Sequence, residues 1–386
     1  MSGPPVLTIL IPTYNRPGLL RRVLSYYGAQ TTRWPLMVAD SSSSPASEAN
    51  AGVVALLADD LEIRLLNFPP SIRLEDKLQQ ALQAVPTPYV ALCGDDDFVL
   101  PGPLGRAADF LAAHPDFALA HGRAYSVLFG RLGPVVTPYH QRSVLADHPA
   151  DRLTDHLSHY ATTFYSVHIT EQAAAIYAAA VSVTRDAIFA ELLTSCLSIL
   201  DGKAMCLPEL YMVRQATPGT TGTVLGTARL LADPEYAERY AAFRGALASA
   251  LAPSLDPAAA ARLVDGAFQA YLAAVTRPPQ PPGPVELLAG RAARLAALLP
   301  RALRALSTGG GLPALLRDPA AWLGQLSFAR QVDQFMGTRP EELAAFQSAY
   351  QLLAAYPAGM PSDLDLGPGG GGVYAGKVSE SHDAAP

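Results

Sequence analysis

Short apolar runs alternate with amphipathic stretches over residues 1–217 of this sequence. Apolar runs bounded by turn-forming residues predict strands at residues 6–11, 35–40, 62–68, 89–93 and 116–127. Apolar residues at helical spacing predict helices at residues 17–30, 73–85, 101–114 and 185–203. Strands that alternate with helices are typical of an α/β fold with a parallel or mixed sheet. In such folds, ligands bind at the carboxyl ends of the strands.

The chain changes character after this unit. Residues 226–357 have a helical pattern, in which Asp256 before Pro257 gives a capping residue followed by proline at the first helical position. A proline-rich break at residues 277–284 divides this region. Residues 358–386 hold too little apolar surface to offset the entropy of ordering. The sequence therefore predicts an α/β unit at 1–217, a helical C-terminal region at 226–357 and a disordered Gly/Pro-rich tail at 358–386.

Composition narrows the classes of function. Of the 386 residues, 50% are hydrophobic and 16% charged, which is ample material for a buried core. The net charge of −6 argues against bulk nucleic-acid binding through a basic surface. Three cysteines without a close metal-ligand pair fit a reducing compartment. The N-terminus has no basic region before its apolar run, so no signal peptide is predicted and we expect a cytoplasmic protein.

An arginine-rich stretch at residues 286–306 has two interpretations. It can lie on an anionic membrane surface, or it can pack on its own domain with its arginines in water. We favour the second, because most such helices pack on their own domain. We expect at most peripheral membrane contact.

Polar residues gather where the predicted strands end. The loop PTYNR (12–16) follows the first strand, Asp40 ends the second, and Lys77 lies on the helix before the fourth. Three consecutive aspartates, Asp95 to Asp97, follow that fourth strand although like charges repel. Carboxylates are hard ligands that select Mg²⁺ or Mn²⁺, which proteins hold together with substrate phosphates.

Each feature also has a structural alternative. The loop can be an ordinary turn, Asp40 a cap, and Lys77 a solvated helix position. The aspartates can form a solvated acidic turn, although the apolar runs on both sides of them make this less favourable. Taken together and in this order, the four features favour a ligand site.

The stretches LTILIPTYNRPGLLRRVL and TPYVALCGDDDFVLP, with Asp40 between them, resemble the nucleotide-binding half of family 2 glycosyltransferases. With FYSVH (164–168) and GKAMCLPELYMVRQ (202–215), the sequence is most similar to a bacterial branch found near surface-polysaccharide genes. The resemblance implies a GT-A fold, which is a Rossmann-like α/β fold with a mixed, mostly parallel sheet, here with a helical C-terminal extension. It also implies a nucleotide-sugar donor, usually carrying UDP, and Mn²⁺ or Mg²⁺.

The resemblance further implies site residues. It places the nucleotide at Pro12, Thr13, Tyr14, Asn15, Arg16, Asp40, Asp95 and Asp96, and makes Lys77 a candidate contact of the diphosphate. It places the metal at Asp95 and Asp97. The sequence departs from the family at Gly94, where an acidic residue is common, so the aspartate that touches the metal stays open. It also departs after Asp40, where DSSSS replaces a frequent Asp and Gly.

The helix predicted at 185–203 carries a candidate general base. Its apolar residues form one stripe, and the opposite face holds Glu191 among Thr194, Ser195 and Ser198, which predicts the wall of an acceptor cleft. Inversion at a sugar carbon requires a carboxylate to take the proton of the acceptor hydroxyl. Family members often have Glu-Asp here, whereas this chain has Glu191-Leu192. If Glu191 is not the base, Asp201 and Glu209 are the next candidates.

The predicted function is therefore a metal-dependent inverting glycosyltransferase. A nucleotidyltransferase is an alternative, but it needs a glycine-rich phosphate loop that IPTYNRPG does not provide. A catalytically silent module that binds a nucleotide sugar or a glycan on the same fold is another. A zinc site at His156, His159 and His168 is not predicted, because no carboxylate or cysteine completes it at familiar spacing. The acceptor stays open between polysaccharide, lipid-linked glycan, small molecule and modified base.

Overall fold

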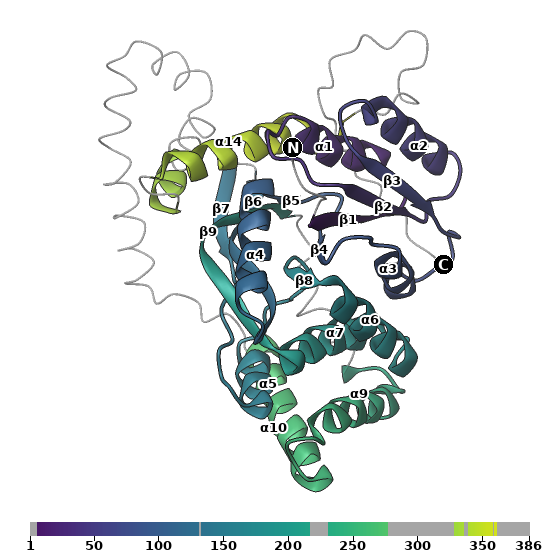
Figure 1. The fold of residues 1–386 in the computed structure, drawn as a ribbon, viewed down its shortest axis with the longest axis vertical. Helices are drawn as coiled ribbons and strands as arrows, with labels where there is room; N and C mark the ends of the chain where they lie inside the picture. The colour runs from purple at the N-terminus through teal and green to yellow at the C-terminus, as the bar shows by residue number, and fades with distance from the viewer. Residues whose placement is uncertain are drawn as a thin grey trace, which may run out of the picture.

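The computed structural model describes residues 6–130, 133–216, 231–276, 328–335, 339–357 and 359–360. Within these ranges a nine-stranded sheet has the order β3-β2-β1-β4-β8-β6-β9-β5, with β7 paired to β6 (Figure 1). The strands are β1 (Leu7–Thr13), β2 (Leu36–Asp40), β3 (Ile63–Asn67), β4 (Tyr89–Leu92), β5 (Phe98–Val99), β6 (Phe117–Gly130), β7 (Gly133–Tyr139), β8 (Val167–Ile169) and β9 (Lys203–Ala216).

The sheet is mixed and mostly parallel, which confirms the predicted fold class. Strands β1 to β4 run parallel to one another. The short strand β8 is antiparallel to both β4 and β6, so β6 and its parallel partner β9 run in the direction of β1. Six of the nine strands therefore share one direction, and β5, β7 and β8 oppose them. This is a GT-A-like arrangement with further helices towards the C-terminus.

Helices cover both faces of the sheet. They are α1 (Pro17–Gly28), α2 (Ala46–Leu57), α3 (Leu74–Gln83), α4 (Pro101–Ala113), α5 (Pro149–Ser158), α6 (Thr170–Val183), α7 (Ala187–Asp201), α9 (Tyr236–Leu251), α10 (Pro257–Thr276) and α14 (Pro340–Ala355). Side chains alternate across a strand, so Ile9 and Ile11 of β1 join the core under α1 and α4. Leu10 between them joins the opposite core with residues of α3 and α6.

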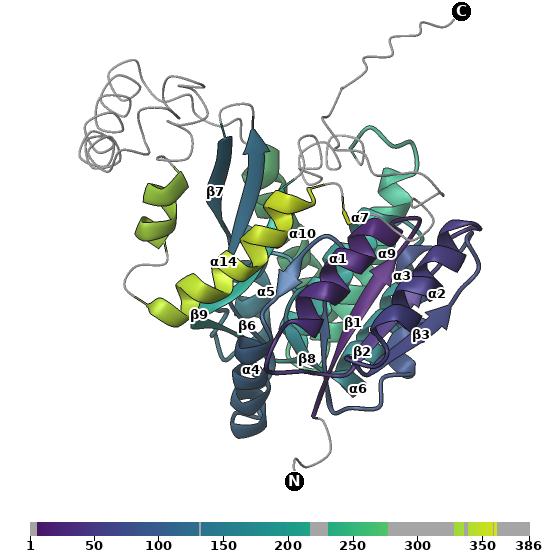
Figure 2. The same ribbon diagram turned by 90° about the horizontal axis from the view of Figure 1, so that it is seen from above.

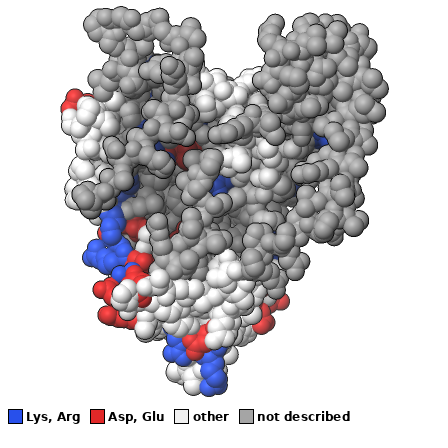
Figure 3. Space-filling model, turned by 180° about the vertical axis from the view of Figure 1, so that it is seen from behind, with Lys and Arg blue, Asp and Glu red and all other residues white. Residues whose placement is uncertain are grey.

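A separate core, formed by helices alone, lies below the sheet in Figure 1. Helices α5, α7, α9 and α10 enclose a cluster that contains Phe189, Phe243 and Phe268 (Figure 1). Its surface carries ion pairs such as Arg244 with Asp265, and charged side chains of both signs are interspersed over the described surface in Figure 3. Asp256 caps α10 by accepting hydrogen bonds from two backbone amides, as its position before Pro257 predicts.

The C-terminal helices do not form one separate body. Helices α9 and α10 pack against α5 and α7, which precede residue 217 in the sequence. Helix α14 instead lies beside α1 and contributes Phe346 and Leu353 to the core of the sheet (Figures 1 and 2). The boundary at 217–226 therefore divides the sequence but not the cores. The predicted proline-rich break, the arginine-rich stretch and nearly all of the predicted tail lie outside the described residues.

All three cysteines are free, two of them buried. None of the described helices combines the length and apolar character that crossing a membrane requires.

Candidate active site

The site lies where the order of the parallel strands reverses. The chain passes from β1 to β2 and β3 on one side and then returns to β4 on the other side of β1. Ligands of open α/β sheets bind in the crevice that this reversal leaves at the carboxyl ends of the strands. Here the Thr13 hydroxyl at the end of β1 donates to Asp95 Oδ2 in the loop after β4, at 2.8 Å. The predicted loop and the aspartate cluster therefore meet at the crevice.

The loop after β1 is fixed to the loop after β2. Asn15 has φ 55°, a left-handed conformation that asparagine adopts more readily than most residues. Its backbone N–H donates to Ser42 Oγ at 2.7 Å, and its side-chain oxygen accepts from the backbone N–H of Ser43 at 3.0 Å. Tyr14, next to it, is 51% exposed. The two loops thus form one rigid rim that presents an aromatic ring to solvent.

Asp40 shapes this rim from within. The residue is buried, and its Oδ1 accepts from the backbone N–H of Ser42 at 2.8 Å while its Oδ2 accepts from Asn50 Nδ2 at 3.0 Å. Both oxygens are therefore engaged inside the fold, whereas the sequence led us to expect a carboxylate open to the nucleotide. Asn50, on α2, was missed because nothing in the sequence pairs it with Asp40.

Lys77 is buried rather than poised at the surface of α3. Its ammonium donates to the backbone oxygen of Thr13 at 2.8 Å and to Ser41 Oγ at 2.9 Å. Burial lowers the pKa of Lys77, and the charges of Asp40 and Asp95 oppose this shift. The sequence predicted a cation able to approach a phosphate, and in the structure this ammonium joins the ends of β1 and β2 beneath the rim.

Asp97, one of the two predicted metal ligands, is turned into the fold. The residue is 1% exposed, its Oδ2 accepts from the Tyr165 hydroxyl at 2.6 Å, and its Oδ1 accepts from the backbone N–H of Gln215 at 3.0 Å. Burial raises the pKa of Asp97 to about 6, with the charge of Asp96 adding to the shift and Arg214, Tyr165 and Gln215 opposing it. A carboxylate whose oxygens both serve internal donors is poorly placed to bind a metal ion from solvent.

Asp96 is the more open of the other two aspartates, whereas Asp95 is buried and shares the exposed Arg16 with it. The Arg16 guanidinium lies 3.1 Å from Asp95 Oδ1 and 3.5 Å from Asp96 Oδ2, so one cation touches both carboxylates. The Asp96 side chain is 34% exposed and that of Arg16 is 53% exposed. Across the described ranges, no group of three or more His, Cys, Asp or Glu side chains is arranged to hold a metal ion. Two carboxylates on one side still suit an ion that takes its other ligands from phosphates and water.

Arg214 is a site residue that the sequence did not reveal. It lies near the end of β9, with its Nε 3.8 Å from Asp97 Oδ2 and its guanidinium 4.5 Å from the ring centroid of Tyr139. Its buried Nε has no hydrogen-bond partner among the described residues. The sequence shows only a single basic residue after the apolar run LYMV. That residue could not be assigned to the site without knowing that β9 ends beside the aspartates.

Glu191 projects from the first half of α7. The residue is exposed, and its Oε1 accepts from the Tyr160 hydroxyl at 2.9 Å. Desolvation by the surrounding protein raises the pKa of Glu191, which Tyr160 opposes and the charge of Glu75 increases. Burial also raises the pKa of Tyr139, and the charges of Glu191 and Asp97 both add to that shift. The charge of Arg214 opposes this shift at Tyr139.

The hydroxyl face of α7 differs from the predicted cleft wall. Thr194, Ser195 and Ser198 are all buried. Ser195 Oγ accepts from the Thr163 hydroxyl at 3.2 Å, and the Ser198 hydroxyl donates to the backbone oxygen of Thr194. Small hydroxyl side chains here let the loop before β8 pack closely on the helix, which explains their presence without a ligand. Glu191 alone of the four is exposed.

The two alternative bases lie apart from this arrangement. Asp201 ends α7, ten residues or about 15 Å along the helix from Glu191. Glu209 accepts from Arg106 Nε at 2.6 Å. Glu191 is therefore the candidate that the structure favours.

The profile of the family described as "Glycosyl transferase family 2" matches residues 8–169, which hold the rim and the acidic loop. This part of the chain is a family 2 glycosyltransferase domain. No curated protein matches the whole sequence significantly.

Solved structures similar to this chain include S. aureus TarS 1–349 in complex with UDP-GlcNAc, which is 13% identical with a TM-score of 0.49. That match covers 69% of this chain and 72% of TarS 1–349. The mannosyltransferase PcManGT from Pyrobaculum calidifontis, in complex with GDP-Man and Mn²⁺, is 18% identical with a TM-score of 0.43. That match covers 87% of this chain and 88% of the other. Both identities are too low to indicate a shared sugar or acceptor.

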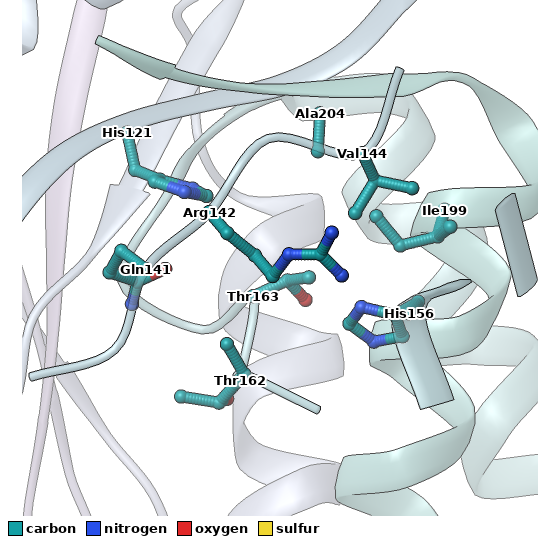
Figure 4. Close-up of a pocket in the computed structure, with 10 residues that line it drawn as sticks. His121, Gln141, Arg142, Val144, His156, Thr162, Thr163, Ile199 and Ala204 are labelled. Carbon is teal, nitrogen blue, oxygen red and sulfur yellow. The ribbon is translucent and has the colours of Figure 1, made fainter. Parts of the chain in front are cut away.

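Two histidines, His121 and His156, help to line a small polar cavity. His121, His156, Gln141 and Arg142 surround a space of about 10 Å³, which is room for a single water molecule. Figure 4 shows the Arg142 side chain extending from beside His121 toward His156. The Nε2 atoms of both histidines and Oε1 of Gln141 are buried without a hydrogen-bond partner in the described residues. A bridging water satisfies such groups in many proteins.

These histidines make stability depend on pH. Burial lowers the pKa of His121, His156 and His168 to about 4, and the charge of Arg142 adds to the shift at His156 while Asp155 opposes it. In the unfolded chain each pKa is about 6.5. Between these values the unfolded state binds more protons, so we expect the free energy of unfolding to fall as the pH falls from about 6.5 toward 4. Each neutral histidine contributes up to about 1.4 kcal/mol per pH unit.

Urea denaturation at several pH values from 7 to 5 measures this slope. His121→Gln should lower the slope by about one proton relative to the wild type. An unchanged slope in the variant would show that His121 binds as many protons in the folded protein as in the unfolded chain over this pH range.

Proposed function

We propose that this family 2 glycosyltransferase transfers a sugar from a nucleoside diphosphate donor, with UDP the first candidate, to a hydroxyl acceptor with inversion and with a divalent cation. The observation that carries the proposal is the meeting of two charged groups at the crevice between β1 and β4. These groups are the open carboxylate of Asp96 and the cation of Arg214, which lies beside Asp97 of the same loop. They supply the charges that donor binding needs.

The rim formed by the loops after β1 and β2 suits the nucleoside. Tyr14 offers an exposed ring on which a base can stack, and the Ser42–Ser43 backbone is held in one conformation by Asn15 and Asp40. Pro12 and Thr13 end β1 and aim this loop at the crevice. In this proposal Asp40 acts by fixing the rim, and Lys77 adds positive charge beneath it.

The acidic loop and Arg214 suit the diphosphate. The carboxylates of Asp95 and Asp96 would hold Mg²⁺ or Mn²⁺, in place of the contact that both now make with Arg16. Such an ion supplies positive charge that stabilises a departing diphosphate. Arg214 provides a second positive charge with an unsatisfied N–H, and its position over Tyr139 limits its movement. An arginine can donate two parallel hydrogen bonds to phosphate oxygens.

Glu191 suits the acceptor side. An acceptor hydroxyl must lose its proton as it attacks the sugar, and a carboxylate with a raised pKa takes that proton more effectively near neutral pH. The hydrogen bond from Tyr160 fixes the orientation of the Glu191 carboxylate through one of its two oxygens. Arg214 and a bound divalent cation can stabilise the leaving diphosphate, but neither can accept this proton.

The different surroundings of Asp96 and Asp97 generate a paired prediction. Asp96→Asn should remove the Mn²⁺-dependent part of UDP affinity and leave the melting temperature near that of the wild type, because Asp96 is open to solvent. Asp97→Asn should lower the stability by about 1–3 kcal/mol, because it disturbs a buried carboxylate that serves internal donors. Isothermal titration with UDP, with Mn²⁺ or with EDTA, and urea denaturation measure the two effects.

Undiminished UDP binding in EDTA would contradict the metal requirement. If Asp97→Asn is stable but loses Mn²⁺-dependent UDP binding, while Asp96→Asn binds UDP as the wild type does, then Asp97 rather than Asp96 is the metal ligand.

Glu191→Gln tests the base directly. The substitution keeps the size of the side chain and most of its hydrogen bonding, so affinity for the nucleotide sugar should barely change. Turnover should fall by about 10²–10⁴, the usual contribution of a positioned base. Release of the nucleoside diphosphate in the presence of acceptor measures turnover. Glu209→Gln is the matched control, because Glu209 pairs with Arg106 away from the crevice and its loss should leave turnover unchanged.

Near-normal turnover of Glu191→Gln on the true acceptor would remove this residue from the mechanism. A wild-type protein that binds nucleotide sugars tightly and releases no product with any acceptor would favour the catalytically silent module instead.

A further inference from the structure

The chain after α14 comes back to α1, the helix that follows the loop after β1. We call residues 356–357 and 359–360 the C-terminal strap. The backbone N–H of Met360 donates to the backbone oxygen of Gly18 at 2.8 Å, in the first turn of α1. The strap therefore lies against the helix that begins one residue after Arg16 (Figure 2).

Two glycines make this contact possible. A Cβ atom on Gly18 would lie 2.5 Å from the backbone oxygen of Met360, far closer than atoms of this kind approach. A Cβ atom on Gly359 would lie 2.5 Å from the backbone carbon of Gly18, and Gly359 has φ +98°, a conformation that favours glycine. Neither obstacle is a flexible side chain that can turn aside. The close approach of the two backbones thus requires glycine on both sides.

Arg22 connects the strap to the acidic loop. Its side chain is fully buried on α1 and donates to three oxygens from distant parts of the sequence: the backbone oxygens of Tyr356 and Asp96 and the side-chain oxygen of Gln215, at 2.7, 2.9 and 2.8 Å. Burial lowers the pKa of Arg22, and the charges of Asp95, Asp96 and Asp97 oppose this. A buried guanidinium is costly unless its donors are satisfied, so losing the Tyr356 acceptor disturbs the other two contacts.

Gln215 completes the connection. Its side-chain oxygen accepts from Arg22, its side-chain nitrogen donates to the backbone oxygen of Pro357 at 2.7 Å, and its backbone N–H donates to Asp97 Oδ1. It also directly follows Arg214 in the sequence. The strap therefore contacts, through one arginine and one glutamine, the backbone that presents Asp96 and the strand end that presents Arg214.

We propose that the C-terminal strap is a positioning element of the donor site, which holds the acidic loop and the end of β9 at the spacing that a diphosphate requires. Arg22 and Gln215 are its positioning residues and do not touch the donor. The proposal rests on the proposed function, because it assumes that the diphosphate lies between Asp96 and Arg214. It also explains why Tyr356, 334 residues from Arg22 in the sequence, is held against α1.

Gly18→Ala displaces the strap without touching the site. The new Cβ atom collides with the backbone of Met360, whereas alanine within a helix is at least as favourable as glycine. Gly52→Ala on α2 is the matched control, because nothing lies within 4 Å of its Cβ position. Both variants are made in the full chain, and affinity for UDP and for the UDP-sugar that the wild type turns over is measured by isothermal titration. Melting temperature, the KM for acceptor and hydrogen exchange of residues 93–100 are measured beside it.

We expect Gly18→Ala to weaken donor binding about tenfold, because that is the effect of losing roughly one well-placed interaction. Exchange in residues 93–100 should become faster, while the melting temperature and the KM for acceptor stay near the wild-type values and Gly52→Ala behaves as the wild type. Gln215→Ala should also weaken donor binding, and adding it to Gly18→Ala should weaken it little further, because both changes break one connection.

Wild-type donor affinity in Gly18→Ala would overturn this inference and leave the proposed function standing. If Gly18→Ala lowers the melting temperature, weakens donor binding and also raises the KM for acceptor, the inference is also overturned. The strap would then only support the fold in general. Failure of the wild type to bind any nucleotide sugar would overturn the proposed function, and this inference with it.

Discussion

The arrangement of the site depends on the two hydrogen bonds that the buried carboxylate of Asp97 accepts. A charge with 1% exposure is tolerated only where donors replace the water it has lost, and here they come from Tyr165 and the backbone of Gln215. These two partners belong to the loop before β8 and to the end of β9. Because Asp97 draws both toward the loop after β4, it also brings Arg214 and Tyr139 to the crevice.

Three adjacent aspartates are stable in this loop because their surroundings differ. Asp95 accepts from Thr13 at the end of β1, Asp97 faces inward, and Asp96 alone is substantially open to solvent. Three cations offset their mutual repulsion. Arg16 contacts the Asp95 carboxylate, Arg22 donates to the backbone oxygen of Asp96, and Arg214 lies beside the Asp97 carboxylate. The buried ammonium of Lys77 adds to this field. A chain with a net charge of −6 thus places positive charge around the residues where an anionic diphosphate is proposed to bind.

The sequence predicted the first half of the fold well, because its signals are local. The apolar runs of β1, β2 and β4 and the helical spacing of α1, α3 and α4 are clear, and their bounds in the structure agree with the prediction to within a few residues. Helix α2 escaped prediction because it buries little more than Ala49, Asn50 and Val53, too weak a stripe to recognise. The short β5 and β8 exist only through their pairing with β9, β4 and β6.

The position of the site was predictable, but the roles within it were not. Strand ends and charge were enough to bring the loop after β1 and the aspartates together. Whether Lys77 faces a phosphate or supports a loop depends on Thr13 and Ser41 in space, which no local pattern encodes. The inward turn of Asp97 depends on Gln215, 118 residues away, and the hydroxyl face of α7 is buried by a loop that its periodicity cannot reveal.

A crystal structure of the protein with a UDP-sugar and Mn²⁺ tests the central claim most directly, because it locates the diphosphate relative to both sides of the crevice. The account predicts the base against Tyr14, Mn²⁺ on Asp96 with Asp95 beside it, and the diphosphate in contact with Arg214, while Asp97 keeps its contacts with Tyr165 and Gln215. A donor bound away from the crevice between β1 and β4, or a metal ion held by Asp97 with Arg214 far from the phosphates, would contradict it.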